Sequence, residues 1–288
     1  ELNSFIVGDN FGEGIYASPN WLVDEYIYDT KGDDLIFGNS GSDDIGTSEG
    51  NDIVFSGKGN DRIIGSKGND EFYGGEGNDY LYGEDWNENE HGNDELYGND
   101  GDDIIRGEGG DDVIYGGSGN DTLEGDGPAA TRDNQFGKDT IYGEDGEDRI
   151  WGHEGDDFID GGNGNDEIYG GDGNDILDGG FKDDILTGGS GADTFILSNG
   201  TDQINDFNIN DGDKISFANN LSYSISQSAN DLLVTVNSLG NFLLKGISDS
   251  EFDANQHILF TDTTPPNAPT SLTTAATTTS DTTPTITG

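Results

Sequence analysis

The sequence predicts an all-β solenoid, in which short strands stack into two parallel sheets around a thin apolar core. Three observations carry this prediction: an aspartate returns every nine residues, glycines stand at fixed places before it, and an apolar residue follows it two positions later. A fixed period over so long a stretch indicates a repeat architecture before any local pattern does. A clean copy of the unit reads Gly74-Gly75-Glu76-Gly77-Asn78-Asp79-Tyr80-Leu81-Tyr82.

Each nine-residue unit divides into a turn and a strand. Glycines adopt backbone angles that residues with a Cβ avoid, so we expect the first six residues to form a turn. The last three should form a short strand, whose middle side chain points away from its two neighbours. This middle residue is apolar in all seventeen copies between about Lys31 and Ile196, which marks the inward face: Ile36, Ile45, Val54, Ile63, Phe72, Leu81, Leu96, Ile105, Ile114, Leu123, Ile141, Ile150, Ile159, Ile168, Leu177, Leu186 and Phe195.

Two units make one coil of eighteen residues, with two strands and two turns. Stacked coils place alternate strands in two parallel sheets that face each other across the core. With about 4.8 Å between neighbouring strands, eight to nine coils make a roll of roughly 40 Å.

The unit resembles the RTX, or hemolysin-type, calcium-binding nonapeptide repeat, whose pattern is G-G-x-G-x-D-x-U-x with U apolar. This resemblance covers residues 31–197. It implies a right-handed parallel β-roll that binds Ca²⁺, and type I secretion from a Gram-negative-type bacterium.

Calcium suits the turns because it prefers six to eight oxygen ligands in irregular geometry. A turn offers one carboxylate and several backbone carbonyls, and turns eighteen residues apart stack on the same side of the roll, so two turns can clasp one ion. Neighbouring pairs within the two columns give up to about fifteen sites. One column contains Asp34, Asp52, Asp70, Asp94, Asp112, Asp139, Asp157, Asp175 and Asp193, and the other contains Asp43, Asp61, Asp79, Asp103, Asp121, Asp148, Asp166 and Asp184.

Backbone carbonyls should complete these sites. Two sites should be weaker, because Lys182 replaces the third glycine before Asp184, and Thr47 and Ser48 replace the first two before Asp52. The alternative is that hydrogen bonds alone hold the turns, but stacked carboxylates without cations would repel each other strongly. Representative carbonyl ligands are those of Gly74, Glu76, Gly116, Ser118, Gly161, Asn163, Gly170 and Asp172.

The composition supports a folding switch. The chain has 288 residues, a formal net charge of -49, 48 glycines and only 30% hydrophobic residues, which would favour disorder unless cations neutralise the acid. We therefore expect the chain to stay unfolded at cytosolic calcium and to fold in a secreted, extracellular or cell-surface setting. The chain does not begin with Met and shows no signal peptide, so we interpret it as part of a longer protein.

The same composition excludes several classes of function. The absence of cysteine excludes a disulfide scaffold and thiol chemistry. Strong acidity disfavours nucleic acid, whose phosphates it would repel. No long apolar run predicts insertion into a membrane.

The period breaks twice, near residues 85–91 and 127–136. Both insertions fall in turns of the Asp94 and Asp139 column, two coils or about 10 Å apart. One interpretation is a ligand or partner site, because insertions in solenoids gather on one face that often binds. The other is a tolerated surface loop, held by its own calcium. The candidate cluster is Trp86, His91, Arg132 and Phe136.

Aromatic residues recur at the outward end of alternate strands. Stacked aromatic pairs across strands stabilise a sheet by themselves. The alternative is a surface for glycans or for another surface protein, since an exposed apolar patch often marks an interaction. The ladder comprises Phe37, Phe55, Tyr73, Tyr97, Tyr115 and Tyr142.

The flanks lack the repeat. Residues 1–30 should cap the first coil, as a solenoid requires. Residues 198–260 should form a C-terminal β cap, with strands at 232–236 and 241–245 and an end at 257–260. The Thr- and Pro-rich residues 261–288 resemble the opening of a bacterial Ig-like adhesin repeat, or they form a linker.

No catalytic constellation is visible, so we expect no enzymatic activity from this chain. It lacks H-E-x-x-H and G-x-S-x-G motifs, and its carboxylates are too many for one acid/base pair to stand out. We expect a calcium-folded module of a large RTX adhesin, acting as an extender or adhesive segment. The alternatives are a carbohydrate-binding module of a polysaccharide-modifying enzyme whose catalytic domain lies elsewhere and, less favoured, an ice-binding roll.

Overall fold

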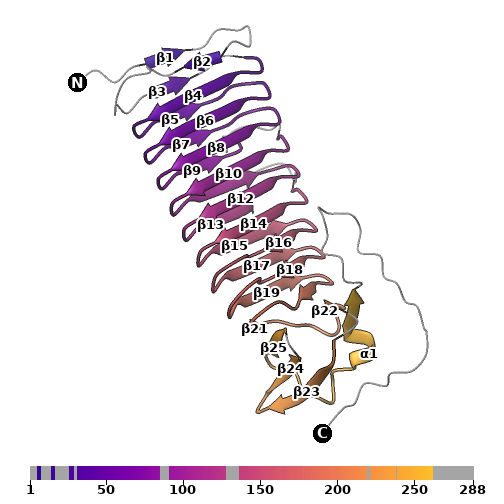
Figure 1. Cartoon of the computed structure of the whole chain (residues 1–288). Coiled ribbons are helices and arrows are strands. Elements are labelled where there is room, and N and C mark those ends of the chain that lie inside the picture. The colour runs from indigo at the N-terminus through magenta and orange to yellow at the C-terminus, as the bar shows by residue number, and fades with distance from the viewer. Residues whose placement is uncertain are drawn as a thin grey trace.

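A computed structural model describes residues 5–7, 14–16, 26–28, 31–84, 91–127, 136–218, 221–237 and 239–261. Its strands stack one above the next along a rod, and the strand numbers rise from one end to the other (Figure 1). The rod is built from two sheets whose strands alternate along the chain. This is the all-β parallel roll that the nine-residue period predicts.

The first sheet has fourteen strands and contains every odd-numbered strand of the roll. Strands β23 to β25 close it at the C-terminal end in the order β21-β25-β24-β23. The bounds are β1 Phe5–Val7, β3 Tyr26–Tyr28, β5 Asp44–Gly46, β7 Arg62–Ile64, β9 Tyr80–Tyr82, β11 Ile104–Glu108, β13 Thr122–Asp126, β15 Arg149–Glu154, β17 Glu167–Asp172, β19 Ile185–Ser190, β21 Thr201–Ile204, β23 Tyr223–Ser228, β24 Asp231–Val236 and β25 Gly240–Leu244.

The second sheet has twelve strands, all of them even-numbered. Their bounds are β2 Gly14–Tyr16, β4 Leu35–Ser40, β6 Ile53–Lys58, β8 Glu71–Glu76, β10 Glu95–Asp100, β12 Val113–Ser118, β14 Thr140–Asp145, β16 Phe158–Asp160, β18 Ile176–Asp178, β20 Thr194–Ile196, β22 Lys214–Ala218 and β26 Ile258–Thr261. A single short helix, α1 Ala254–His257, is present among the described residues and precedes β26.

The register is that of a solenoid. Neighbouring strands of the roll run parallel, and equivalent residues of successive coils face each other, as in Ile45 opposite Ile63 and Ile63 opposite Leu81. The two interruptions do not shift this register, since Phe72 pairs with Leu96 and Ile114 with Ile141. All seventeen predicted inward residues are fully buried, so the predicted core is confirmed.

The turns require glycine because the backbones of successive coils are in direct contact there. At Gly77, where φ is +133°, an added Cβ would lie 1.7 Å from the carbonyl oxygen of Gly59 in the preceding coil. No side chain fits there, and φ in this range is costly for residues with a Cβ. Lys182 occupies the equivalent position before Asp184 and still adopts φ +85°.

Both ends add strands to the sheets. β1 and β3 pair within the first sheet, and β2 pairs with β4 in the second. β21 and β22 continue the two sheets beyond residue 197, and β23, β24 and β25 form an antiparallel meander. The expected strands at 232–236 and 241–245 correspond to β24 and β25. The segment resembling an Ig-like repeat lies outside the described residues from 262 onward.

In the part of the chain that the structure describes, no helix is long and apolar enough to cross a membrane.

Two neighbouring isoleucines test the assignment of inward and outward faces. Ile63 is fully buried, whereas Ile64 on the same strand faces outward and is half-buried. We expect Ile63→Ala to lower the free energy of unfolding by about 2–5 kcal/mol, because it leaves a cavity in the core. The matched Ile64→Ala should cost less than about 1 kcal/mol. Urea unfolding at one saturating calcium concentration measures both, and equal losses would contradict the assignment.

Candidate calcium sites

Each column aspartate from Asp52 onward is tied to the coil before it. Its Oδ1 accepts the backbone N–H of the aspartate in the preceding coil, as Asp103 does from Asp79 at 2.7 Å and Asp121 from Asp103 at 2.8 Å. The same bond joins Asp94 to Asp112 and Asp112 to Asp139, across the second interruption. One carboxylate oxygen of each turn is therefore used by the backbone, and the aspartates predicted from the period stand in two continuous columns.

The second carboxylate oxygen is left over. These aspartates are 0 to 2% exposed, and their Oδ2 atoms are buried without a hydrogen-bond partner. Buried polar atoms are normally paired, and an unpaired buried charge is costly, so a repeated exception indicates a missing ligand. The atoms concerned are Oδ2 of Asp52, Asp79, Asp94, Asp103, Asp112, Asp121, Asp139, Asp148, Asp157, Asp166, Asp175, Asp184 and Asp193.

Most of these oxygens lie close against the first glycine of their turn. A Cβ added to Gly98 would lie 2.3 Å from Asp103 Oδ2 and 2.4 Å from the carbonyl oxygen of Gly116. At Gly152 the corresponding distances are 2.3 Å to Asp157 Oδ2 and 2.6 Å to the carbonyl of Gly170. The Cβ position itself is too close to the glycine Cα for an ion, but a carboxylate and a carbonyl that both lie this near one point are close enough for one calcium ion, which binds oxygen at about 2.3–2.6 Å, to bridge them. We call this pair of oxygens, beside the first glycine of a turn, the cradle.

The predicted carbonyl ligands fall into two groups. Those of the first glycines, Gly74, Gly116, Gly161 and Gly170, belong to cradles or contact a side chain beside one. Those of the third positions, Glu76, Ser118, Asn163 and Asp172, accept backbone N–H groups from the preceding coil at 2.7 to 3.1 Å. The second group therefore has one lone pair engaged in the turn, which leaves the first-glycine carbonyls as the better-placed ligands.

The donor set is that of a hard cation. Among the described residues, no three His, Cys, Asp or Glu side chains converge as a metal cluster, so each site must combine one carboxylate with backbone oxygens. Carboxylate and carbonyl oxygens suit calcium rather than zinc or copper. The residues therefore fit the ion that the repeat implies.

Burial without a cation changes the acidity of these groups. Burial, together with the charges of neighbours in the column, raises the pKa of Asp79, Asp103 and Asp148 to about 7. The backbone N–H bond to each carboxylate opposes the shift but does not cancel it. The metal-free turns therefore hold these aspartates partly protonated at neutral pH, and a divalent cation would replace those protons.

One cradle has a side chain beside it. Ser56 takes the first-glycine position before Asp61, is fully buried, and its Oγ donates to the carbonyl oxygen of Gly74 at 2.5 Å. A hydroxyl oxygen therefore contacts the carbonyl at this position, where most other turns have glycine. Thr47 takes the same position before Asp52, as the sequence analysis noted for a weaker site.

Four further buried acids were not anticipated from the sequence. Asp202 and Asp213 extend the two columns into the C-terminal cap, where their Oδ1 atoms accept the N–H groups of Asp184 at 3.3 Å and Asp193 at 3.1 Å. Asp202 stands nine residues after Asp193, so the nine-residue period could have predicted it as a further column aspartate. Glu84 and Asp126, beside the interruptions, are 2% and 1% exposed.

The interruptions lie where the period placed them. One follows β9 and the other follows β13, and both lead to the second sheet on the same side of the roll. Of the predicted cluster, Trp86 and Arg132 lie outside the described residues. His91 is half-buried and Phe136 is 45% exposed.

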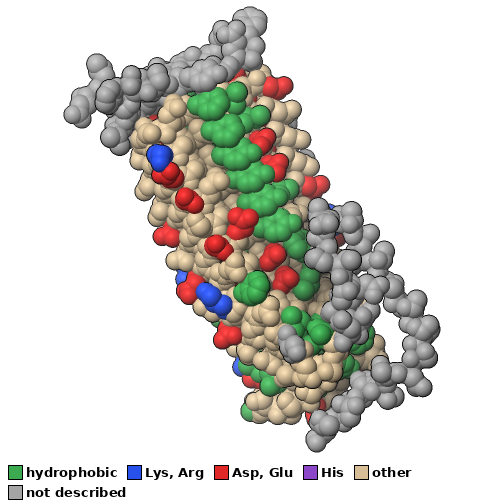
Figure 2. Space-filling model, in the orientation of Figure 1, with side chains coloured by type: hydrophobic (Ala, Val, Ile, Leu, Met, Phe, Trp, Pro, Cys, Tyr) green, Lys and Arg blue, Asp and Glu red, His purple; other side chains and the backbone are tan. Residues whose placement is uncertain are grey.

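The aromatic ladder forms as the spacing predicts, and a hydrophobic stripe runs down the roll from its N-terminal end (Figure 2). Its rings stack almost parallel, with centroids 4.6 to 5.3 Å apart from Phe37 to Tyr142. Each inner ring therefore has both faces covered by its neighbours. A sugar stacks on an open ring face, so this geometry favours the stabilisation of the sheet over glycan binding by the ladder.

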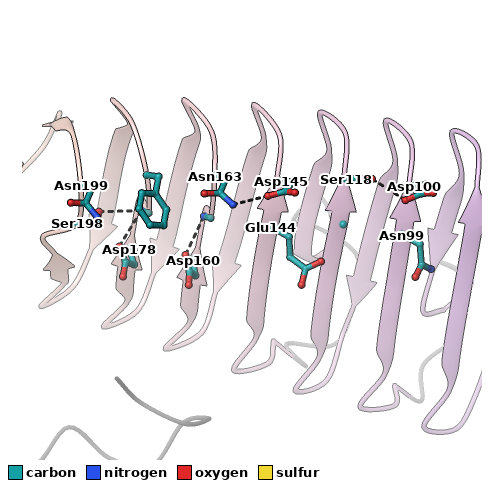
Figure 3. Close-up of a pocket in the computed structure, with 14 residues that line it drawn as sticks. Asn99, Asp100, Ser118, Glu144, Asp145, Asp160, Asn163, Asp178, Ser198 and Asn199 are labelled. Atoms are coloured by element: carbon teal, nitrogen blue, oxygen red, sulfur yellow. Dashed lines mark hydrogen bonds between the residues drawn. The ribbon is translucent and has the colours of Figure 1, made fainter. Parts of the chain in front are cut away.

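Beyond Tyr142 the ladder positions are taken by Asp160 and Asp178. Their Oδ1 atoms accept the N–H groups of Gly162 and Gly180, each at 3.1 Å. An open groove of about 730 Å³ runs along this edge, lined by polar side chains from successive turns (Figure 3). Phe181, which is 54% exposed, is the aromatic side chain in its lining.

Two parallel sheets face each other, and within the described ranges columns of buried aspartates in the turns have an oxygen with no hydrogen-bond partner. These features define a calcium-binding parallel β-roll. The family model for the RTX calcium-binding nonapeptide repeat matches residues 24–54, 55–85, 92–123, 135–168 and 169–204, which make up more than half of the chain. The chain therefore belongs to this family, whose repeats bind Ca²⁺ between turns.

Two solved structures are similar. The extracellular lipase LipA from Serratia marcescens is 22% identical with a TM-score of 0.29, and the match covers 76% of this chain but 45% of the lipase. The AlgE6R3 subunit of the Azotobacter vinelandii mannuronan C5-epimerase is 22% identical with a TM-score of 0.22, over 61% of this chain and 92% of that subunit. The chain thus spans less than half of the lipase. The comparison with curated proteins finds no match.

Gly98→Ala tests the cradle directly. Gly98 does not have a positive φ, so alanine is not strained there, but its Cβ would clash with Asp103 Oδ2 and with the Gly116 carbonyl oxygen and would push the two apart. We expect about one fewer bound calcium ion and a higher calcium requirement for folding. The control is Gly46→Ala, whose Cβ would meet only the exposed Tyr28 ring. Isothermal titration measures the stoichiometry, and an unchanged value in Gly98→Ala would refute the cradle.

The raised pKa values predict a pH-dependent calcium requirement. Because the folded-state pKa of Asp79 is raised to about 7 from its usual value of 3.8, folding without metal is favoured at low pH and loses this stability as pH rises through 7. The aspartates of the unfolded chain stay ionised over this range, so lower pH stabilises the fold, and the calcium concentration at half-folding should fall as pH falls from about 8 to about 6. Circular dichroism during calcium titration measures it, and a midpoint independent of pH would contradict the prediction.

Proposed function

We propose that this chain is a calcium-folded module of a large secreted or cell-surface bacterial adhesin, where it acts as an extender or adhesive segment. The observation that carries the proposal is the unbroken parallel register of both sheets from β4 to β20, across both interruptions. A continuous stack of hydrogen-bonded strands over this length suits a stiff spacer. The proposal assigns no catalytic role to the chain.

The charge of the chain supports a role outside the cytosol. A formal net charge of -49 and buried columns of aspartates oppose folding where free calcium is low. Extracellular calcium modules bind with affinities of about 10⁻⁴–10⁻³ M, which matches the calcium outside cells and not inside them. Such a chain would leave the cell unfolded and become stiff after secretion.

The second candidate is a carbohydrate-binding module. The groove favours it, because Asn163, Asn199, Ser198 and four aspartates supply the hydrogen-bonding groups that saccharides use, beside the exposed ring of Phe181. Its carboxylates, including Asp145 and Glu144, would repel a polyanionic polysaccharide, so the groove suits a neutral glycan better. The aromatic ladder lacks the flat Thr and Asn array that an ice-binding roll requires.

Mechanical unfolding tests the extender role. A chain tethered by its two ends should resist extension in calcium and then release the 31–197 roll, with a contour-length gain of roughly 550 Å. In excess chelator, or with magnesium in place of calcium, it should extend at low force, because magnesium demands a rigid octahedral geometry that these turns do not offer. Equal compliance in calcium and in chelator would rule the extender role out.

A glycan array separates the two candidates. The extender proposal expects the calcium-folded chain to show no glycan signal that depends on the groove. Glycan binding that is lost in Phe181→Ala but kept in Phe55→Ala would instead support the carbohydrate-binding module, since Phe55 is exposed and lies on the ladder away from the groove.

A further inference from the structure

Each interruption of the period adds a second buried acid to a calcium turn. Glu84 directly follows Gly83, the first residue of the turn that ends at Asp94, and Asp126 directly follows Gly125, the first residue of the turn that ends at Asp139. Regular copies have glycine, asparagine, serine or another residue at this second position, and among them only Glu108 and Glu144 are acidic. The repeat motif supplies one carboxylate for a turn, so these two turns have one more than the motif requires.

The backbone explains why these two acids turn inward. At the second position of most regular turns φ is positive, as in Gly75 at +108° and Glu144 at +71°, and the Glu144 side chain is exposed. Neither Glu84 nor Asp126 has a positive φ. A change in the sign of φ sends the Cβ to the other side of the chain. The same position that projects an acid outward in a regular turn therefore projects it inward beside an interruption.

The Asp126 carboxylate enters an incomplete site. Its Oδ1 accepts the N–H of Gly137 at 3.3 Å, and its Oδ2 is buried without a partner. In the adjoining cradle, a Cβ at Gly125 would lie 2.2 Å from Asp139 Oδ2 and 2.9 Å from the Gly152 carbonyl. Burial, together with the charge of Asp126, raises the pKa of Asp139 to about 8. Two carboxylates with unpaired oxygens thus share one turn.

The Glu84 carboxylate is buried in the equivalent turn two coils earlier, although both of its oxygens face backbone N–H groups. Its Oε1 accepts the N–H of Gly92 at 2.5 Å, and its Oε2 lies 3.5 Å from the N–H of Gly109 in the next coil. A Cβ at Gly83 would lie 2.2 Å from Asp94 Oδ2 and 2.3 Å from the Gly107 carbonyl. Burial and the charge of Asp94 raise the pKa of Glu84.

We propose that Glu84 with Asp94, and Asp126 with Asp139, form two calcium sites that bind the ion more tightly than the single-carboxylate sites of the regular turns and fill before them. The affinity of a calcium site rises with the number of charged ligands, and two buried carboxylates without a cation would repel each other. Both sites lie in the middle of the roll, so their early occupation would order coils on either side of them.

Calcium titration of the full chain with a competing chelator tests this. The wild-type chain should show two classes of site, with about two ions bound at least tenfold more tightly than the rest. Glu84→Gln and Asp126→Asn should each remove one tight site, and the double variant should remove both while keeping the weaker class. The controls Glu147→Gln and Asp102→Asn remove exposed acids next to column aspartates and should leave both classes unchanged.

Conservative variants separate charge from packing. Glu84→Asp and Asp126→Glu keep the carboxylate, so they should retain a tight class that the amide variants lose. Equal loss in the conservative and amide variants would overturn the proposal, as would a single class of sites in the wild-type chain. If an amide variant fails to fold even in saturating calcium, the wild-type titration decides, because two tight ions must be present there. Circular dichroism at saturating calcium monitors the fold.

Discussion

The fold depends on an aspartate whose two oxygens have different partners. Oδ1 accepts a backbone N–H from the preceding coil and joins one turn to the next, while Oδ2 is buried beside a glycine with no partner in the protein. Repeated in two columns, this arrangement buries a series of carboxylates whose Oδ2 atoms have no hydrogen-bond partner among the described residues. We therefore expect the roll to be stable to the extent that cations, or protons at lower pH, neutralise these groups.

The rest of the architecture follows from this constraint. The core is thin, with one fully buried apolar residue from each strand, so it cannot by itself outweigh the repulsion of the aspartates. The ladder from Phe37 to Tyr142 adds stacking on the outer face of one sheet. Glycines are needed where one backbone touches the next, which explains how a chain with so few apolar residues forms so regular a solenoid.

Much of this could be predicted from the sequence, because a fixed period determines which residues face one another. The position of a residue within the nine-residue repeat was enough to predict the inward residues and the two aspartate columns. It also predicted the aromatic ladder and the placement of both interruptions. The burial of Glu84 and Asp126 could not be predicted, since it depends on the sign of φ where the period breaks. Asp213 stands twenty residues after Asp193 and thus out of phase, and only the path of the cap brings it into the column. The groove at Asp160 and Asp178 arises from the packing of turns and has no signature in the period.

Anomalous diffraction from crystals grown in calcium, or in a lanthanide that replaces it, tests the central claim most directly. The account predicts ions in two lines along the edges of the roll, each bound by an aspartate Oδ2 such as that of Asp103 and by the first-glycine carbonyl of the next coil, such as Gly116. A well-ordered roll with no ions beside these oxygens would contradict it, because the buried carboxylates would then be neutralised in some other way.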